Sequence, residues 1–203
     1  MRAAVRVSVF GAIGAAVVAA VVMVWGGAEP ARRQEPARRQ MAKACPRMPA
    51  PPLPPRGDTP ERFYALADVA KLEVAAGHLD EADALATEVL ALAPMFVGDW
   101  NHGNAIHHGH GVHGLVALAR GNLAEARRQL LASGDTEGSP QLNSFGPSMA
   151  LASALLEHGE RATVLAYLEQ CRRFWELGRD KLDAWAAEIA ANRTPDFFFN
   201  RCL

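Results

Sequence analysis

The chain has 203 residues, of which 50% are hydrophobic, 21% charged and 7% aromatic, and its formal net charge is −1. With only 3 cysteines, this composition excludes a collagen-like chain, a wholly disordered chain and a disulfide scaffold. It also excludes a polytopic membrane protein, because only one apolar run is long enough to span a bilayer. Residues 1–60 carry nine Lys/Arg and three Asp/Glu, whereas residues 61–203 carry twelve and nineteen. A basic arm therefore precedes an acidic domain.

The first predicted element is an apolar helix over residues 7–25, an uncharged run of nineteen residues. At 1.5 Å per residue it covers roughly 28 Å, close to the thickness of the bilayer core. This full length favours an uncleaved single-pass membrane anchor, whereas a cleaved signal peptide ending near Gly26-Gly27-Ala28 is the alternative. We therefore interpret residues 1–28 as a membrane anchor or signal segment.

Residues 29–59 follow as a basic and proline-rich linker. The sequence Glu-Pro-Ala-Arg-Arg-Gln occurs twice in residues 29–40, and seven prolines lie within residues 46–60. Since proline fixes φ and lacks an amide donor, we expect an extended spacer that holds the domain away from the bilayer. Binding to a groove that reads proline-rich helices and binding to anionic lipid are the alternatives. We expect no nucleic-acid binding, because the acidic domain repels phosphate.

Two features of the sequence predict opposite membrane orientations. The larger cluster of arginines lies after the apolar run, which favours a cytoplasmic domain. The order of a basic start followed by an apolar run favours export. We expect a single-pass membrane protein whose domain is exported, in a periplasmic or other extracytoplasmic location.

Residues 60–203 predict an all-α domain. Thr59-Pro60-Glu61 is typical of a helix start, and glycines at 77, 121 and 159 divide successive helices. No segment alternates with a period of two, so we predict no strand. The apolar spacing predicts helices over 61–76, 79–93, 104–120, 123–132, 147–158, 161–177 and 180–192.

The predicted helix pairs share a frame. A glycine is followed by Ala or Val five residues later and by an apolar residue after four more, at Gly77/Ala82/Ala86, Gly121/Ala126/Leu130 and Gly159/Val164/Leu168. With Pro94 seventeen residues after the first glycine, residues 61–177 resemble a degenerate form of the tetratricopeptide repeat (TPR) family.

The resemblance implies a short right-handed solenoid of about three helical hairpins that binds a peptide or protein on one face, and it implies no catalysis. We expect the first helices of the pairs to form a concave binding face. The helix over 180–192 and the tail at Phe197-Phe198-Phe199 are expected to cap the stack.

A histidine cluster is the one chemical anomaly, with five histidines interleaved with glycines between residues 102 and 113. Imidazole is a common ligand of transition metals, so the candidate metal ligands, for an ion such as zinc, are His102, His107, His110 and His113. Packed or surface histidines and a polar ligand-binding lining are the other interpretations. The zinc-protease pattern and a cysteine pair at zinc spacing are both absent from the sequence.

Residues 133–147 are the longest connection without a predicted element, and long connections in small domains are often functional. The candidate partner-binding residues are Trp100, His108, Asn143 and Ser144. If the domain is exported, a Cys171–Cys202 disulfide could fasten the tail; otherwise the cysteines are ordinary thiols.

The sequence therefore favours a membrane-tethered adaptor that binds an unknown protein or peptide and contacts the membrane through residues 7–25. We assign no catalytic residue and no cofactor, and an adaptor is favoured over an enzyme. The alternative is a metal-binding or metal-dependent protein that uses the His102–His113 cluster.

Overall fold

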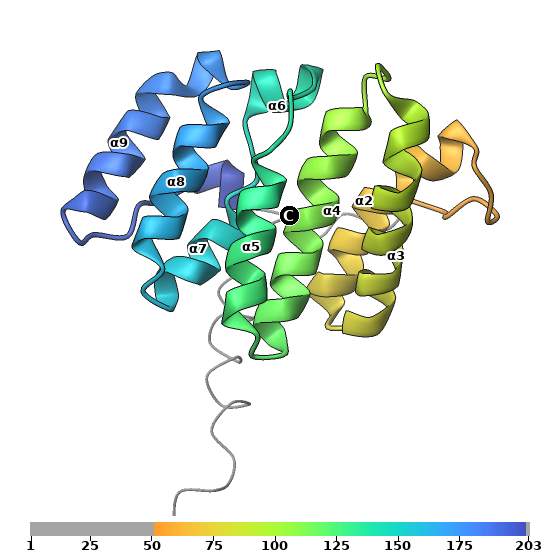
Figure 1. Ribbon diagram of the computed structural model, residues 1–203, viewed down its shortest axis with the longest axis horizontal. Coiled ribbons are helices and arrows are strands. Elements are labelled where there is room, and N and C mark those ends of the chain that lie inside the picture. The colour runs from red at the N-terminus through yellow and green to blue at the C-terminus, as the bar shows by residue number, and fades with distance from the viewer. Residues whose placement is uncertain (1–50, 202–203) are drawn as a thin grey trace, which may run out of the picture.

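The computed structural model describes residues 51–201, and within that range the fold is entirely helical (Figure 1). The prediction of an all-α domain is confirmed. The apolar run at 7–25, the basic repeat at 29–40 and Cys202 lie outside the described residues. Between residues 51 and 201, no helix is both long enough and apolar enough to cross a membrane.

The elements follow one another in pairs along the chain. The α-helices are α2 (Pro60–Ala76), α3 (Leu79–Leu92), α4 (His102–Ala119), α5 (Leu123–Ser133), α6 (Pro140–Phe145), α7 (Ala150–Glu157), α8 (Arg161–Cys171) and α9 (Arg179–Ala190). Short 3-10 helices occupy the connections: η1 (Ala93–Phe96), η2 (Glu176–Gly178) and η3 (Phe198–Arg201).

Local signals set the helix ends. The Thr59 side chain caps α2 by accepting from the Arg62 amide, and Pro60 fills the first position of the helix. Gly77 ends α2 in the left-handed conformation, with φ of 86°. Gly121 and Gly159 take the same conformation after α4 and α7. Each glycine therefore allows the chain to reverse direction within a few residues, so that the next helix runs antiparallel to the one before.

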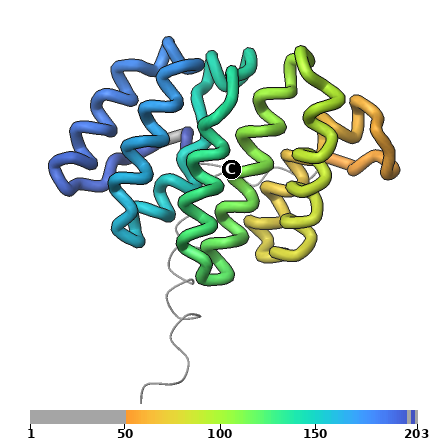
Figure 2. The backbone as a smooth tube through the Cα atoms, viewed as in Figure 1, coloured from red at the N-terminus to blue at the C-terminus, as the bar shows by residue number. Residues whose placement is uncertain are grey.

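Helices pack against their neighbours in sequence (Figure 2). α2 pairs with α3, α4 with α5 and α7 with α8, while α4 also contacts α2 and α7. One buried cluster joins α2, α3 and α4, and a second joins α4, α5, α7, α8 and α9. The apolar core is therefore distributed along the stack, and α4 contributes to both parts of it.

The helix ends meet at two opposite edges of the molecule (Figure 1). The turns at Gly77, Gly121 and Gly159 form one edge, which we call the glycine-turn edge. The connections over 93–101, 134–149 and 172–178 form the other, which we call the long-connection edge.

Two sequence expectations fail at the long-connection edge. Residues 133–147 contain α6, because Ser139 caps this helix by accepting from the Leu142 amide at 3.0 Å and Pro140 begins it. α8 ends at Cys171, and not near Leu177, because the chain turns so that Phe174 and Trp175 enter the core. In both cases local capping and long-range packing override the amphipathic pattern.

The C-terminal segment covers the last helix pair. Trp185 of α9 contacts Trp175 on one side and the buried Phe197 on the other. The Asn200 carbonyl accepts from the Met149 amide at 2.5 Å, which ties the tail to the start of α7. Cys171 is buried as a free thiol.

Candidate functional site

The histidine-bearing helix α4 lies between α3 and α5, and three of its glycines, Gly103, Gly109 and Gly114, pack against neighbouring parts of the chain. A Cβ on Gly109 would meet Leu90 at 2.8 Å, and one on Gly114 would meet Leu151 at 2.1 Å. A Cβ on Gly103 would meet the Gly138 carbonyl oxygen at 1.8 Å. These glycines therefore permit close packing, which offsets their low helix propensity.

His107 is a buried, neutral histidine. Its Nδ1 lies 2.9 Å from the Ser133 carbonyl, which can only accept, and its Nε2 accepts from the Ser148 amide at 2.9 Å. Burial lowers the pKa of His107 to about 4. The ring thus joins the end of α5 to the start of α7, with both nitrogens occupied.

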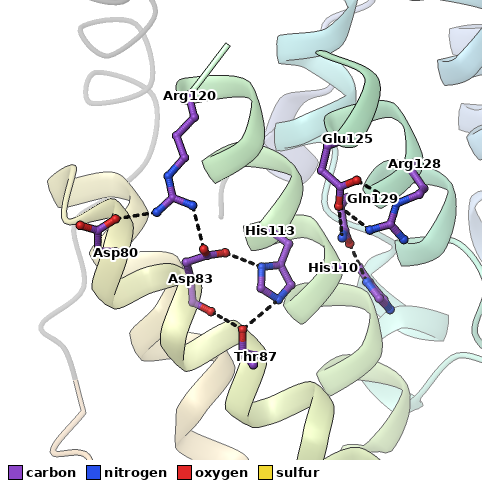
Figure 3. Close-up of polar contacts among 9 residues, drawn as sticks. All are labelled: Asp80, Asp83, Thr87, His110, His113, Arg120, Glu125, Arg128 and Gln129. Carbon is purple, nitrogen blue, oxygen red and sulfur yellow. Dashed lines mark hydrogen bonds and ion pairs between the residues drawn. The ribbon is translucent and has the colours of Figure 1, made fainter. Parts of the chain in front are cut away.

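His113 belongs to a polar network between α3 and α4 (Figure 3). Its Nδ1 lies 2.6 Å from Asp83 Oδ1, and Arg120 donates to Asp83 Oδ2 at 2.8 Å. Arg120 also donates to Asp80 at 2.5 Å. Burial raises the pKa of Asp83, but the hydrogen bonds from Arg120 and His113 outweigh it and leave that pKa lowered.

Thr87 completes this network, and its geometry favours a structural role over a catalytic one. Its hydroxyl lies 3.5 Å from Nε2 of His113, which gives a hydroxyl–imidazole–carboxylate order. The same hydroxyl donates to the Asp83 backbone carbonyl at 2.8 Å, so its proton is directed away from the ring. The arrangement therefore ties α3 to α4.

His110 faces the opposite neighbour, α5 (Figure 3). Its Nδ1 lies 2.7 Å from Gln129 Oε1, and Gln129 donates to Glu125 at 2.8 Å. Burial lowers the pKa of His110. His110 and His113 therefore serve different helix pairs, although they are one turn apart.

The remaining two histidines of the cluster lie apart from these networks. His102 is half-buried at the start of α4, where its amide donates to the Asp99 carbonyl at 3.1 Å. His108 is half-buried with its ring edge-on to His107, and burial lowers its pKa well below the usual value. His108 and Lys71 line a small cavity between α2, α4 and α7.

The proposed metal ligands are not brought together. His107 and His113 are held on different sides of α4, and His110 contacts α5. Among residues 51–201, no group of three His, Cys, Asp or Glu side chains is placed to hold one ion.

The long-connection edge begins with residues 93–101, which inward-facing aromatic rings hold in place. Phe96 stacks on Phe63 with ring centroids 4.3 Å apart. The Tyr64 hydroxyl donates to Asp99 at 2.7 Å, and the Trp100 ring lies 5.0 Å from that of Tyr64. The outer face of this connection consists of Met95, Val97 and Trp100, which are 60%, 73% and 47% exposed.

The α5–α7 connection is fixed against the start of α4. Ser139 donates to Asn104 Oδ1 at 2.6 Å, and Asn104 donates to Gln141 at 3.1 Å. Leu142 of α6 is buried, whereas Phe145, three residues later, is 78% exposed. The predicted partner-binding residues Asn143 and Ser144 lie beside Phe145 and are also exposed.

The α8–α9 connection also combines a buried side chain with an exposed apolar neighbour. Trp175 is 2% exposed and packs so closely that a Cβ on Gly146 or Gly178 would lie within about 2.5 Å of its ring. Leu177, between Trp175 and Gly178, is 82% exposed. The backbone is held by a buried ring while the neighbouring leucine faces solvent.

The exposed large hydrophobic side chains among residues 51–197, 200 and 201, whose side chains the structure describes, therefore lie on the long-connection edge: Met95, Val97, Trp100, Phe145 and Leu177. Sequence reasoning identified only Trp100, together with the neighbouring Asn143 and Ser144. It placed His108 with them, but His108 lies on α4 beside Lys71. Val97, Phe145 and Leu177 each directly precede a glycine in a connection, but this order alone does not indicate exposure.

The proline-rich segment meets the domain at the opposite end of the stack from α9. Arg62, which is buried, donates to the Pro54 carbonyl and pairs with Glu88 at 2.7 Å, which lowers the pKa of Glu88. A groove of about 440 Å³ separates residues 53–56 from α3. The linker therefore joins the domain at a fixed point on the first helix pair.

Comparison of the chain with protein-family models, with curated proteins and with solved structures finds no match in any of the three.

Proposed function

We propose that this protein is a membrane-tethered helical adaptor that binds a protein partner through the long-connection edge. The observation that carries the proposal is the gathering of five exposed large hydrophobic side chains on that edge. Exposed apolar groups gathered in one place are typical of interaction sites, and aromatic and methionine side chains are enriched there.

The architecture is consistent with a short TPR-like solenoid. The first hairpin packs on the second mainly through α3 and α4 and also through α2 and α4, and the second packs on the third through α4 and α7 and through α5 and α8. In such a stack each repeat buries its core against its neighbours, so loops at one edge can vary without disturbing the core. The apolar run at 7–25 and the linker at 29–59 are the proposed tether, with the domain exported.

Photo-crosslinking in intact cells tests the proposal. A photoreactive amino acid replaces Val97, Phe145 or Leu177 in the full chain, and Asn122 or Glu157 at the glycine-turn edge in the matched controls. We expect a discrete protein adduct in the membrane fraction from the first three positions and none from the controls. Adducts of equal yield from both edges, or adducts only with lipid or with a second copy of the chain, would contradict the proposal.

A further inference from the structure

We propose that Arg62 acts as a clasp that holds the proline-rich linker against the first helix pair and fixes the direction in which the tether leaves the domain. The tether then has two lengths, a shorter one with the clasp closed and a longer one with the clasp open. This inference rests on the tether of the proposed function and adds a conformational device to it.

The clasp is a buried guanidinium group that contacts both α3 and the linker. Arg62 lies on α2 and is 3% exposed. Its Nε donates to Glu88 Oε1 and its Nη2 donates to Glu88 Oε2 at 2.7 Å, so a two-pronged ion pair joins α2 to α3. Its Nη1 donates to the Pro54 carbonyl. One side chain therefore ties the linker to both helices of the first pair.

Glu88 supplies the charge that keeps Arg62 buried. An arginine without a counterion is costly to bury, and the Glu88 side chain, which is 26% exposed, is that counterion. The hydrogen bond from Arg62 lowers the pKa of Glu88, so the carboxylate stays ionised at neutral pH. Because the donors of a planar guanidinium point in fixed directions, pairing with Glu88 leaves Nη1 directed at the Pro54 carbonyl.

The contacts of the linker with the domain are concentrated at this point. Leu53 is half-buried against the cluster of α2, α3 and α4, whereas residues 55–59 are exposed. The groove between residues 53–56 and α3 shows that this segment is not packed along its length. Loss of the Arg62 bond should therefore release the six residues from Pro54 to Thr59, which extend the tether by up to about 19 Å at about 3.1 Å per residue.

The test measures the distance between two spin labels in the full chain, held in nanodiscs. One label replaces Pro52 in the linker, and the other replaces Ala75, which is exposed near the end of α2. Both labels are genetically encoded, because the chain has its own cysteines. Pulsed electron paramagnetic resonance gives the distribution of distances, and we expect a single narrow distribution when the clasp is intact.

Three variants locate the contact. Arg62→Met with Glu88→Met removes the clasp without leaving a buried charge unpaired, and it should widen the distribution by at least about twofold and lengthen its mean. Arg62→Lys keeps the charge but lacks the planar fork, and it should widen the distribution as well. Glu81→Gln, on the same wall of the groove, is the matched control and should leave the distribution unchanged.

The outcomes separate this inference from the proposed function. A wide distribution in the chain with its clasp intact, or a narrow one in either Arg62 variant, overturns the clasp and leaves the adaptor proposal as it is. If the distributions behave as expected but the cellular adducts at Val97, Phe145 and Leu177 are absent, the clasp stands and the adaptor proposal fails.

Discussion

Both edges of this domain connect one helix to the next, but the connections are held in different ways. At the glycine-turn edge, Gly77, Gly121 and Gly159 reverse the chain with positive φ, and a Cβ at Gly121 or Gly159 would meet nothing within 4 Å. At the long-connection edge, the partly buried Phe96 and the buried Leu142 and Trp175 hold longer segments in place. The first edge only closes hairpins, whereas the second holds exposed apolar groups in fixed positions. A glycine that can adopt positive φ is enough to make a tight turn. Holding exposed side chains in fixed positions requires other side chains packed beneath them.

The largest effect is expected where the long connection meets α4. Gly103→Ala places a Cβ 1.8 Å from the Gly138 carbonyl oxygen, and backbone on both sides cannot yield. We expect a loss of more than about 3 kcal/mol of unfolding free energy, measured by urea denaturation.

The matched control is Gly111→Ala in the same helix, where a Cβ would have no neighbour within 4 Å. Helix propensity alone should then stabilise the protein by about 0.5–1 kcal/mol. A similar response of both variants would show that residue 138 does not pack against α4 as described.

Acid should loosen the junction that His107 makes with the connection at Ser148. Because burial lowers the pKa of His107 from 6.5 to about 4 in the folded protein, the unfolded chain binds its proton first as the pH falls. The stabilisation is complete above pH 6.5 and falls between pH 6.5 and 4. We expect a loss of about 3 kcal/mol over that window from this residue.

Two measurements check this prediction. An NMR titration of the full chain should find the His107 ring neutral at pH 5. His107→Gln should remove about 3 kcal/mol from the pH dependence of the unfolding free energy over that window and leave the part that His108 and His110 contribute. A His107 pKa near 6.5 would contradict the description of a buried ring with a hydrogen bond at each nitrogen.

A smaller effect is expected at the glycine-turn edge. Gly121 has φ of 78°, and a Cβ there would have no neighbour within 4 Å, so Gly121→Ala costs only backbone strain. We expect a loss of about 1 kcal/mol by urea denaturation. A loss as large as that of Gly103→Ala would mean that this turn is also held by packing, and the contrast between the edges would disappear.

The smallest effect on stability is expected from the most exposed side chains of the long-connection edge. Since Phe145 and Leu177 are 78% and 82% exposed, replacing either with serine should change the unfolding free energy by less than about 0.5 kcal/mol. A loss above about 2 kcal/mol from Phe145→Ser or Leu177→Ser would place that side chain in the core.

Much of the fold could be predicted because helices leave local marks. Glycine and proline positions predicted the pairs α2/α3 and α4/α5 with small errors in their bounds. The end of α8 was missed because Trp175 enters the core through long-range packing that periodicity does not encode. α6 was missed although Ser139 and Pro140 form a helix start, since the helix is only six residues long.

The histidine cluster shows more clearly what a single sequence does not predict. The sequence grouped His107, His110 and His113 among the candidate ligands of one metal ion. The structure gives each a different partner, at Ser133, Gln129 and Asp83, because α4 has neighbours on several sides. Which face of a helix is occupied depends on tertiary contacts, and a single sequence does not supply them. The exposed side chains of the long-connection edge were missed for the same reason, since burial of Trp175 and exposure of Leu177 depend on packing.

Photo-crosslinking of the full chain in intact cells tests the central claim most directly. We predict a discrete protein adduct from a photoreactive residue at Val97, Phe145 or Leu177 and none from Asn122 or Glu157 at the glycine-turn edge. Adducts of equal yield from both edges, or from the glycine-turn edge alone, would contradict the assignment of the long-connection edge as the binding surface.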